Sequence, residues 1–132
     1  MSNDRMKFRV WNQSSKSFVD SDMYGMNLCG DLFYFSPSED GVHLSECDDY
    51  TVIEQCTGLK DKNGTLIYEG DIVRAGNDKI TAIGYRGESC SFCHTIIGSK
   101  HSSSISKLWC ETYSPEIIGN IHENPELIEA TK

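Results

Sequence analysis

Residues 90–94 read Cys-Ser-Phe-Cys-His, a spacing that can ligate a metal, carry redox chemistry or attach haem. Haem attachment requires export to an oxidising compartment, and the N-terminus MSNDRMKFRVW lacks the apolar core of a signal peptide. A thioredoxin-type redox pair lies where a strand leads into a helix, and no helical pattern follows residue 94. We therefore set aside both haem and a redox pair.

Zinc is the stronger alternative for this motif. The two-residue gap lets both thiolates reach one ion, and His94, His101 and Cys110 are near enough in sequence to complete a tetrahedron. A structural zinc site usually shows two such cysteine pairs, and the sequence holds no second one. An offset of three along a strand also places Cys90 and Cys93 on opposite faces. We favour an inward Cys93, a partly exposed Cys90 and no cofactor, and the alternative is zinc at Cys90, Cys93, His94 and Cys110.

A second candidate is the pair of carboxylates that flank a glycine at residues 69–71. Such a pair can perform acid–base chemistry or hold a divalent cation. Turn chemistry explains the same residues, with Asp71 accepting backbone N–H groups and Glu69 solvated. We favour the turn, and a metal-dependent hydrolase that uses Glu69, Asp71 or the cysteines is an alternative. The candidate binding residues of this segment are Asp61, Asn63, Tyr68, Glu69, Gly70 and Asp71.

Composition and charge exclude some classes of binding partner. The chain has 132 residues, of which 38% are hydrophobic and 24% charged, as expected for one globular domain. Its 20 acidic and 12 basic residues give a net charge of −8, and the scattered Lys and Arg disfavour binding to a phosphate backbone. An acidic surface instead suits a basic protein partner. No apolar run approaches the roughly 20 residues that span a bilayer, so no membrane segment is expected.

Short alternating segments punctuated by turns predict a mainly β fold. Residues 6–11 alternate apolar and polar, and Asn63-Gly64 is a strong hairpin turn. Further strands are predicted for TLIY, IVRA, ITAIGY, CSFCHTIIG, LWCETY and EIIGNI, and residues 99–107 are expected to be polar and flexible. Asn124 and Pro125 predict the start of a closing helix of about two turns. The fold class is a small β-barrel or rolled antiparallel sheet with a short C-terminal helix, with α+β as the alternative.

Three blocks resemble the YopX-like family of small phage and prophage proteins. They are KFRVWN at 7–12, TGLKDKNGTLIYEGDIV at 57–73 and IIGNIHENPELI at 117–128. The resemblance implies one domain over residues 1–132, a bacterial cytoplasm and self-association to a homo-oligomer. It implies no reaction and supplies no catalytic residue. The region 76–114, which contains the Cys-Ser-Phe-Cys-His motif, lies outside the blocks and is expected to be variable.

These observations favour a non-enzymatic binding module that acts on a host or phage protein. No catalytic motif accompanies the isolated histidines. One alternative is a module that sequesters a small molecule or nucleotide at a barrel mouth or subunit interface, and the metal-dependent hydrolase is another.

Overall fold

The computed structural model describes residues 4–19, 21–39, 41–46, 51–76, 78–99 and 102–129. The chain divides into two compact units, one of residues 1–8 with 54–132 and the other of residues 9–53. Strands β1 (Phe8–Asn12) and β6 (Thr51–Lys60) each contribute residues to both units. The single domain expected over residues 1–132 stays a prediction.

The unit of residues 9–53 consists of short antiparallel strands. Strand β1 pairs with β2, with Trp11 opposite Phe18 and their ring centroids 5.0 Å apart. The guanidinium of Arg9 lies 4.6 Å from the Phe18 ring centroid, a cation–π contact. A separate three-stranded sheet has the order β3-β4-β5. The elements are β2 (Ser17–Phe18), η2 (Ser21–Met23), β3 (Tyr24–Met26), β4 (Leu32–Ser38) and β5 (Gly41–Glu46).

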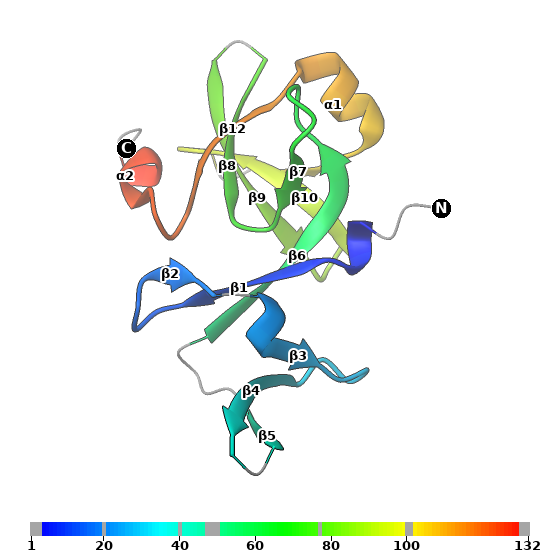
Figure 1. The fold of residues 1–132 in the computed structure, drawn as a ribbon. Helices are drawn as coiled ribbons and strands as arrows, with labels where there is room; N and C mark the ends of the chain where they lie inside the picture. The colour runs from blue at the N-terminus through cyan, green and yellow to red at the C-terminus, as the bar shows by residue number, and fades with distance from the viewer. Residues whose placement is uncertain are drawn as a thin grey trace. The chain divides into compact units, whose positions relative to one another are not determined.

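The unit of residues 1–8 and 54–132 is built on a five-stranded antiparallel sheet in the order β11-β10-β9-β8-β12 (Figure 1). Strand β6 pairs with β7 in antiparallel register. The sheet curls and the chain ends on a short helix, so the predicted mainly β class is confirmed. The remaining elements are η1 (Asp4–Met6), β7 (Leu66–Tyr68), β8 (Asp71–Ala75), β9 (Lys79–Arg86), β10 (Ser91–Ile96), β11 (Ser102–Ser104), α1 (Lys107–Tyr113), β12 (Glu116–Asn120) and α2 (Pro125–Glu129).

Strand register decides which face of this sheet meets the core. Val73 lies opposite Thr81, and Ile83 lies opposite His94. Because alternate residues of a strand share a face, these four side chains lie on the same side of the sheet. Helix α1 adds Trp109 on that side, and a buried cluster results. The cluster consists of Ile67, Val73, Ala75, Ile83 and Trp109.

Helix α1 replaces a strand that the sequence predicted, so the expectation for LWCETY is wrong. The Ser106 side chain caps the helix by accepting from the Trp109 N–H at 3.2 Å. Ser114 ends it with φ 44° and donates its N–H to the Cys110 carbonyl. Trp, Cys, Thr and Tyr are typical of strands, but the cap and the docking of Trp109 outweigh that weak preference.

Residues 102–104 form edge strand β11, where the sequence predicted a flexible polar segment. Strand β10 supplies the ladder, with Thr95 opposite Ser102 and Cys93 opposite Ser104. Backbone hydrogen bonds do not depend on apolar side chains, so a run of serines can complete a sheet edge. That expectation of a flexible segment is therefore wrong for these three residues.

The C-terminal helix α2 begins at Pro125, as predicted, but covers five residues and not two turns. Asn124 uses its side chain differently from the cap that was expected. Its Oδ1 accepts from the Asn120 N–H at 3.2 Å, which folds the segment back onto the end of β12. In the part of the chain that the structure describes, no helix is long and apolar enough to cross a membrane.

Candidate functional site

The turn that follows β6 is held by the buried carboxylate of Asp61. Its Oδ1 accepts from the N–H groups of Asn63 and Thr65, both at 2.9 Å. Its Oδ2 accepts from the Ile117 N–H at 3.1 Å, so one side chain fastens the hairpin turn to β12. These contacts give Asp61 and Asn63 a structural role, and the binding role predicted for them stays a prediction.

The turn at Gly70 is built around a buried acid that the sequence reasoning missed. Gly70 has φ +84°, and a methyl group at this position would overlap the carboxylate of Glu54. Glu54 is 4% exposed, and its Oε2 lies 3.1 Å from Nε2 of His122. Gly70 also donates to the Ile83 carbonyl and accepts from the Ile121 N–H, both at 2.8 Å. Glu54 directly follows two apolar residues in the segment TVIEQC, and an acid that is buried there needs a hydrogen-bonding partner. This position was the signal in the sequence.

The two carboxylates flanking Gly70 also serve the backbone. Asp71 is buried and its Oδ2 accepts from the Tyr68 N–H at 2.7 Å, which is the turn contact that was expected. Glu69 is half-buried and its Oε1 accepts from the Gln55 N–H at 2.9 Å. The expectation of a solvated Glu69 is wrong, because β6 supplies a donor. Both carboxylates are thus engaged in holding strands together.

The Cys-Ser-Phe-Cys-His motif spreads its side chains over a turn and both faces of β10. Cys90 is exposed, has φ 50° and donates its thiol to the Gly87 carbonyl at 3.3 Å. Cys93 is 3% exposed, and His94, the next residue, points to the opposite face. Cys110 lies on α1, where burial raises the pKa of its thiol.

These positions bear on the zinc alternative. Among the described residues there is no group of three or more His, Cys, Asp or Glu side chains that could hold a metal ion. Cys90, Cys93, His94 and Cys110 are therefore not assembled into a tetrahedral site. His101, the further ligand considered, lies outside the described residues.

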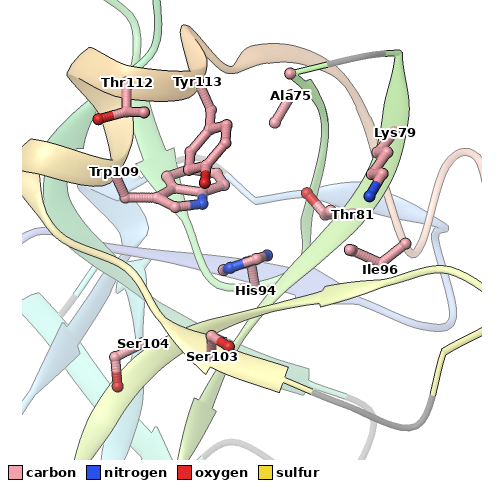
Figure 2. Close-up of a pocket in the computed structure, with 11 residues that line it drawn as sticks. Ala75, Lys79, Thr81, His94, Ile96, Ser103, Ser104, Trp109, Thr112 and Tyr113 are labelled. Carbon is pink, nitrogen blue, oxygen red and sulfur yellow. The ribbon is translucent and has the colours of Figure 1, made fainter.

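A cavity of about 610 Å³ lies between α1 and the sheet, and we call it the α1 pocket (Figure 2). Figure 2 shows Trp109 and Tyr113 on the helix side and His94 and Thr81 across from them on the strand side. The described residues that line it are Ala75, Gly76, Lys79, Thr81, His94, Ile96, Ser103, Ser104, Trp109, Thr112 and Tyr113. A volume of this size falls within the ~300–1,000 Å³ range of small-molecule sites.

His94 is the chemically distinctive group of the α1 pocket. Its ring centroid lies 4.8 Å from that of Trp109, at an interplanar angle of 31°. Its Nδ1 is buried and has no hydrogen-bond partner, a condition shared by no other buried side-chain N or O atom in the described ranges. Burial lowers the pKa of His94, which favours the neutral imidazole at pH 7. Leaving such a group unsatisfied costs about 1–3 kcal/mol, so the site is built at the expense of stability.

Sequence reasoning named His94 only as a possible zinc ligand, and it did not identify the other residues of the pocket. Lys79 begins β9, Trp109 lies on a helix predicted as a strand, and Ser103 lies on a segment predicted to be flexible. The alternation of side chains along a strand could have helped here. Residues 92, 94 and 96 share one face of β10 and residues 93 and 95 share the other, so His94 and Cys93 lie on opposite faces.

The fold and the pocket together define a small, mainly β protein with a cavity beneath a short helix in its larger unit. The chain matches the YopX protein family over residues 7–129 and belongs to that family. It is similar to the crystal structure of protein EF1440 from Enterococcus faecalis, with a TM-score of 0.52 and 25% identity over 92% of this chain and 96% of that one. It is also similar to the crystal structure of the protein yopX from Bacillus subtilis, with a TM-score of 0.64 and 18% identity over 93% of this chain and 98% of that one. No curated protein matches.

Proposed function

We propose that this protein is a non-enzymatic binding module that holds a small molecule in the α1 pocket. The observation that carries the proposal is the buried Nδ1 of His94, which has no partner among the described residues although His94 itself lines a cavity of about 610 Å³. Buried polar groups in folded proteins are hydrogen-bonded in the great majority of cases. A ligand reaches Nδ1 only when the groups that cover this atom move aside, and its contact then supplies the missing hydrogen bond.

The lining favours binding over catalysis. A catalytic histidine is usually oriented by a third group, most often a carboxylate, and works on a nearby nucleophile. Here the His94 ring packs against the Trp109 indole, and the described lining residues include no Asp, Glu or Cys. The carboxylates at residues 61, 69 and 71 accept from backbone amides instead.

The two tryptophans provide a test with an internal control. Each indole N–H gives its own peak in a proton–nitrogen NMR spectrum; Trp109 lines the pocket and Trp11 lies in the other unit. We expect aromatic fragments at millimolar concentration to move the Trp109 indole peak while the Trp11 peak stays in place. The same fragments should leave Trp109 unmoved in a folded His94→Phe variant.

The result that contradicts the proposal is equally plain. If a broad fragment library moves neither indole, or moves both equally, the α1 pocket is not a ligand site. A His94→Phe variant that binds the same fragments with unchanged affinity removes His94 from the site.

A second candidate function is binding to a host or phage protein, and the exposed face of α1 favours it. Leu108 is 70% exposed, and a partner that covers it would remove its apolar surface from water. With the family resemblance we propose a bacterial cytoplasm, a phage or prophage context and self-association for this candidate. Sedimentation of the purified protein tests self-association: a dimer or larger assembly that Leu108→Glu converts to a monomer supports it, and a wild-type monomer contradicts it.

A further inference from the structure

We infer that the α1 pocket selects an anionic small molecule that joins an apolar or aromatic body to one oxyanion, a carboxylate or a phosphate. The inference rests on the proposed ligand-binding function and names the chemical class of its ligand. It follows from the charges, the hydrogen-bond donors and the apolar surface of the described lining residues.

The described lining of the α1 pocket carries a positive charge, whereas the chain as a whole is acidic. The chain carries 20 acidic and 12 basic residues. Yet the 11 described residues that line the pocket include one lysine, Lys79, and no carboxylate. Among these described residues a cationic ligand would meet no opposite charge, while an oxyanion meets one and no like charge. Lys79 is exposed and makes no ion pair with any described residue, so its ammonium can turn to a ligand without breaking a contact.

Several hydrogen-bonding groups of the lining can serve as donors to an oxyanion. Ser103 and Thr112 are exposed residues with hydroxyl donors, and the buried Nδ1 of His94 becomes a donor, in the tautomer that carries the proton there, once a ligand displaces the groups that cover it. Hydrogen bonds in which the acceptor is ionised are roughly twice as strong as neutral ones. The hydroxyls of Thr81 and Ser104 are already engaged, since Thr81 donates to the Val73 carbonyl and Ser104 pairs with Ser91.

The rest of the lining supplies a surface for the apolar body of the ligand. Trp109 and Tyr113 have ring centroids 6.1 Å apart and lie on the same side of α1. Ile96 and Ala75 complete the apolar lining from β10 and β8. Aromatic side chains with few rotatable bonds hold a flat ligand at low cost in conformational entropy. A bare inorganic anion would leave this surface unused.

The second cavity differs from the α1 pocket in the charges of its lining residues. It measures about 360 Å³ and lies between the turn after β6 and the other side of α1. Its lining mixes three lysines with Asp61 and Glu111. An oxyanion entering it would meet charges of both signs, so the argument for an anion applies to the α1 pocket and not to this one.

The test uses isosteric probes that differ in charge. Phenylacetate and phenyl phosphate are the two oxyanion sources, phenylacetamide is the neutral isostere, phenethylamine is the cation, and inorganic phosphate lacks the body. Each is titrated into the full chain while the Trp109 and Trp11 indole peaks are followed by NMR. We expect at least one of the two aryl oxyanions to bind about fivefold or more tightly than phenylacetamide, as a charge-assisted contact at a solvent-exposed rim allows. Phenethylamine and inorganic phosphate should bind more weakly than that oxyanion.

Two lysine variants give the matched control. Lys79→Met removes the ammonium from the α1 pocket, and Lys60→Met removes one that lines the second cavity. Lys79→Met should abolish the preference for the oxyanion over phenylacetamide while leaving the affinity for phenylacetamide unchanged. Lys60→Met should leave both affinities at the wild-type value.

Three outcomes overturn the inference. Equal affinity for phenylacetate, phenyl phosphate and phenylacetamide, or tighter binding of phenethylamine, defeats the anionic class but leaves the ligand pocket standing. Inorganic phosphate that binds as tightly as phenyl phosphate defeats the apolar body. If no probe moves Trp109, the inference and the proposed function fail together.

Discussion

The turns at Asp61 and Gly70 and the pocket under α1 lie in the same unit, and they treat buried polar groups in opposite ways. At the turns, both carboxylate oxygens of Asp61 accept from backbone amides and Glu54 pairs with His122. In the pocket, the buried Nδ1 of His94 has no partner among the described residues. Satisfied networks rigidify a fold, while a half-satisfied group is tolerated where a site needs it. The comparison distinguishes residues that stabilise the fold, such as Asp61 and Glu54, from His94, which we assign to ligand binding.

The sequence blocks that carry the family resemblance contain the turn residues of the first region. The block at 57–73 contains Asp61 and Gly70, and the block at 117–128 contains the residues whose backbone N–H groups they accept from, Ile117 and Ile121. His94, Lys79 and Trp109 all fall between the blocks, in 76–114. The blocks that carry the resemblance therefore contain contacts that fasten the sheet, whereas the family match over residues 7–129 also includes the pocket.

The largest expected effect is at Gly70. Gly70→Ala forces a side chain into φ +84° and into the Glu54 carboxylate. Strain and overpacking together should lower the free energy of unfolding by about 3 kcal/mol or more. Gly64→Ala is the matched control, because Gly64 has φ +83° but no atom lies within 4 Å of the position that an added methyl group would take. It should cost about 1 kcal/mol. Urea unfolding of both variants measures the difference, and equal losses would remove the role of Glu54 at this turn.

The next effect is at Asp61. Asp61→Asn replaces one carboxylate oxygen with an NH₂ group, which cannot accept a hydrogen bond. Depending on the orientation of the amide, the variant loses either the bond from Ile117 or the bonds from Asn63 and Thr65. Unfolding in urea should show a loss of about 2 kcal/mol. Glu88→Gln, at an exposed ion pair with Arg86, is the control and should change stability by less than about 0.5 kcal/mol. Similar small losses for both would mean that Asp61 does not fasten the turn.

At the pocket the comparison predicts an effect of the opposite sign. His94→Phe replaces the unpartnered imidazole with an apolar ring of similar shape. The free energy of unfolding should rise by about 1 kcal/mol, because the unsatisfied group is removed, while probe binding at Trp109 is lost. Thermal unfolding and the NMR titration read the two effects separately. A destabilised variant that still binds the probes would contradict the assignment of His94 to a ligand.

The smallest effect is the pH dependence of the same group. Burial lowers the pKa of folded His94 below its ordinary value of 6.5, so the unfolded chain binds the proton more readily. Stability therefore rises with pH through this window and falls below about pH 6.5 as the unfolded state is protonated. The titratable and aromatic groups that line the pocket with His94 are Lys79 of β9 and Trp109 and Tyr113 of α1. The wild type should lose stability relative to His94→Phe between about pH 7 and pH 5. Parallel curves would show that His94 is not protected from protonation.

Local patterns were enough to predict most of the strands. Alternation indicated β1, the Asn63-Gly64 turn indicated the hairpin to β7, and Asp71 was expected to accept a backbone N–H. Pro125 was correctly expected at the first position of the last helix. These features depend on neighbours within a few residues, and sequence periodicity reports such neighbours directly.

The pocket could not be predicted in this way. It brings together Lys79, His94 and Trp109, which depends on the β9–β10 register and on α1 docking over the sheet. Helix α1 has one buried residue, so no amphipathic period marks it, and its strand-forming residues favoured the wrong prediction. Glu54 and His122, 68 residues apart, meet for the same long-range reason.

The most direct test of the central claim is the nitrogen-15 chemical shift of the His94 imidazole in the full chain, measured without and with phenylacetate and phenyl phosphate. We expect the Nδ1 resonance of the free protein to report a nitrogen without a hydrogen bond. On titration it should shift with the same saturation curve as the Trp109 indole. An Nδ1 that is already hydrogen-bonded in the free protein, or one that stays in place while Trp109 moves, would contradict the account.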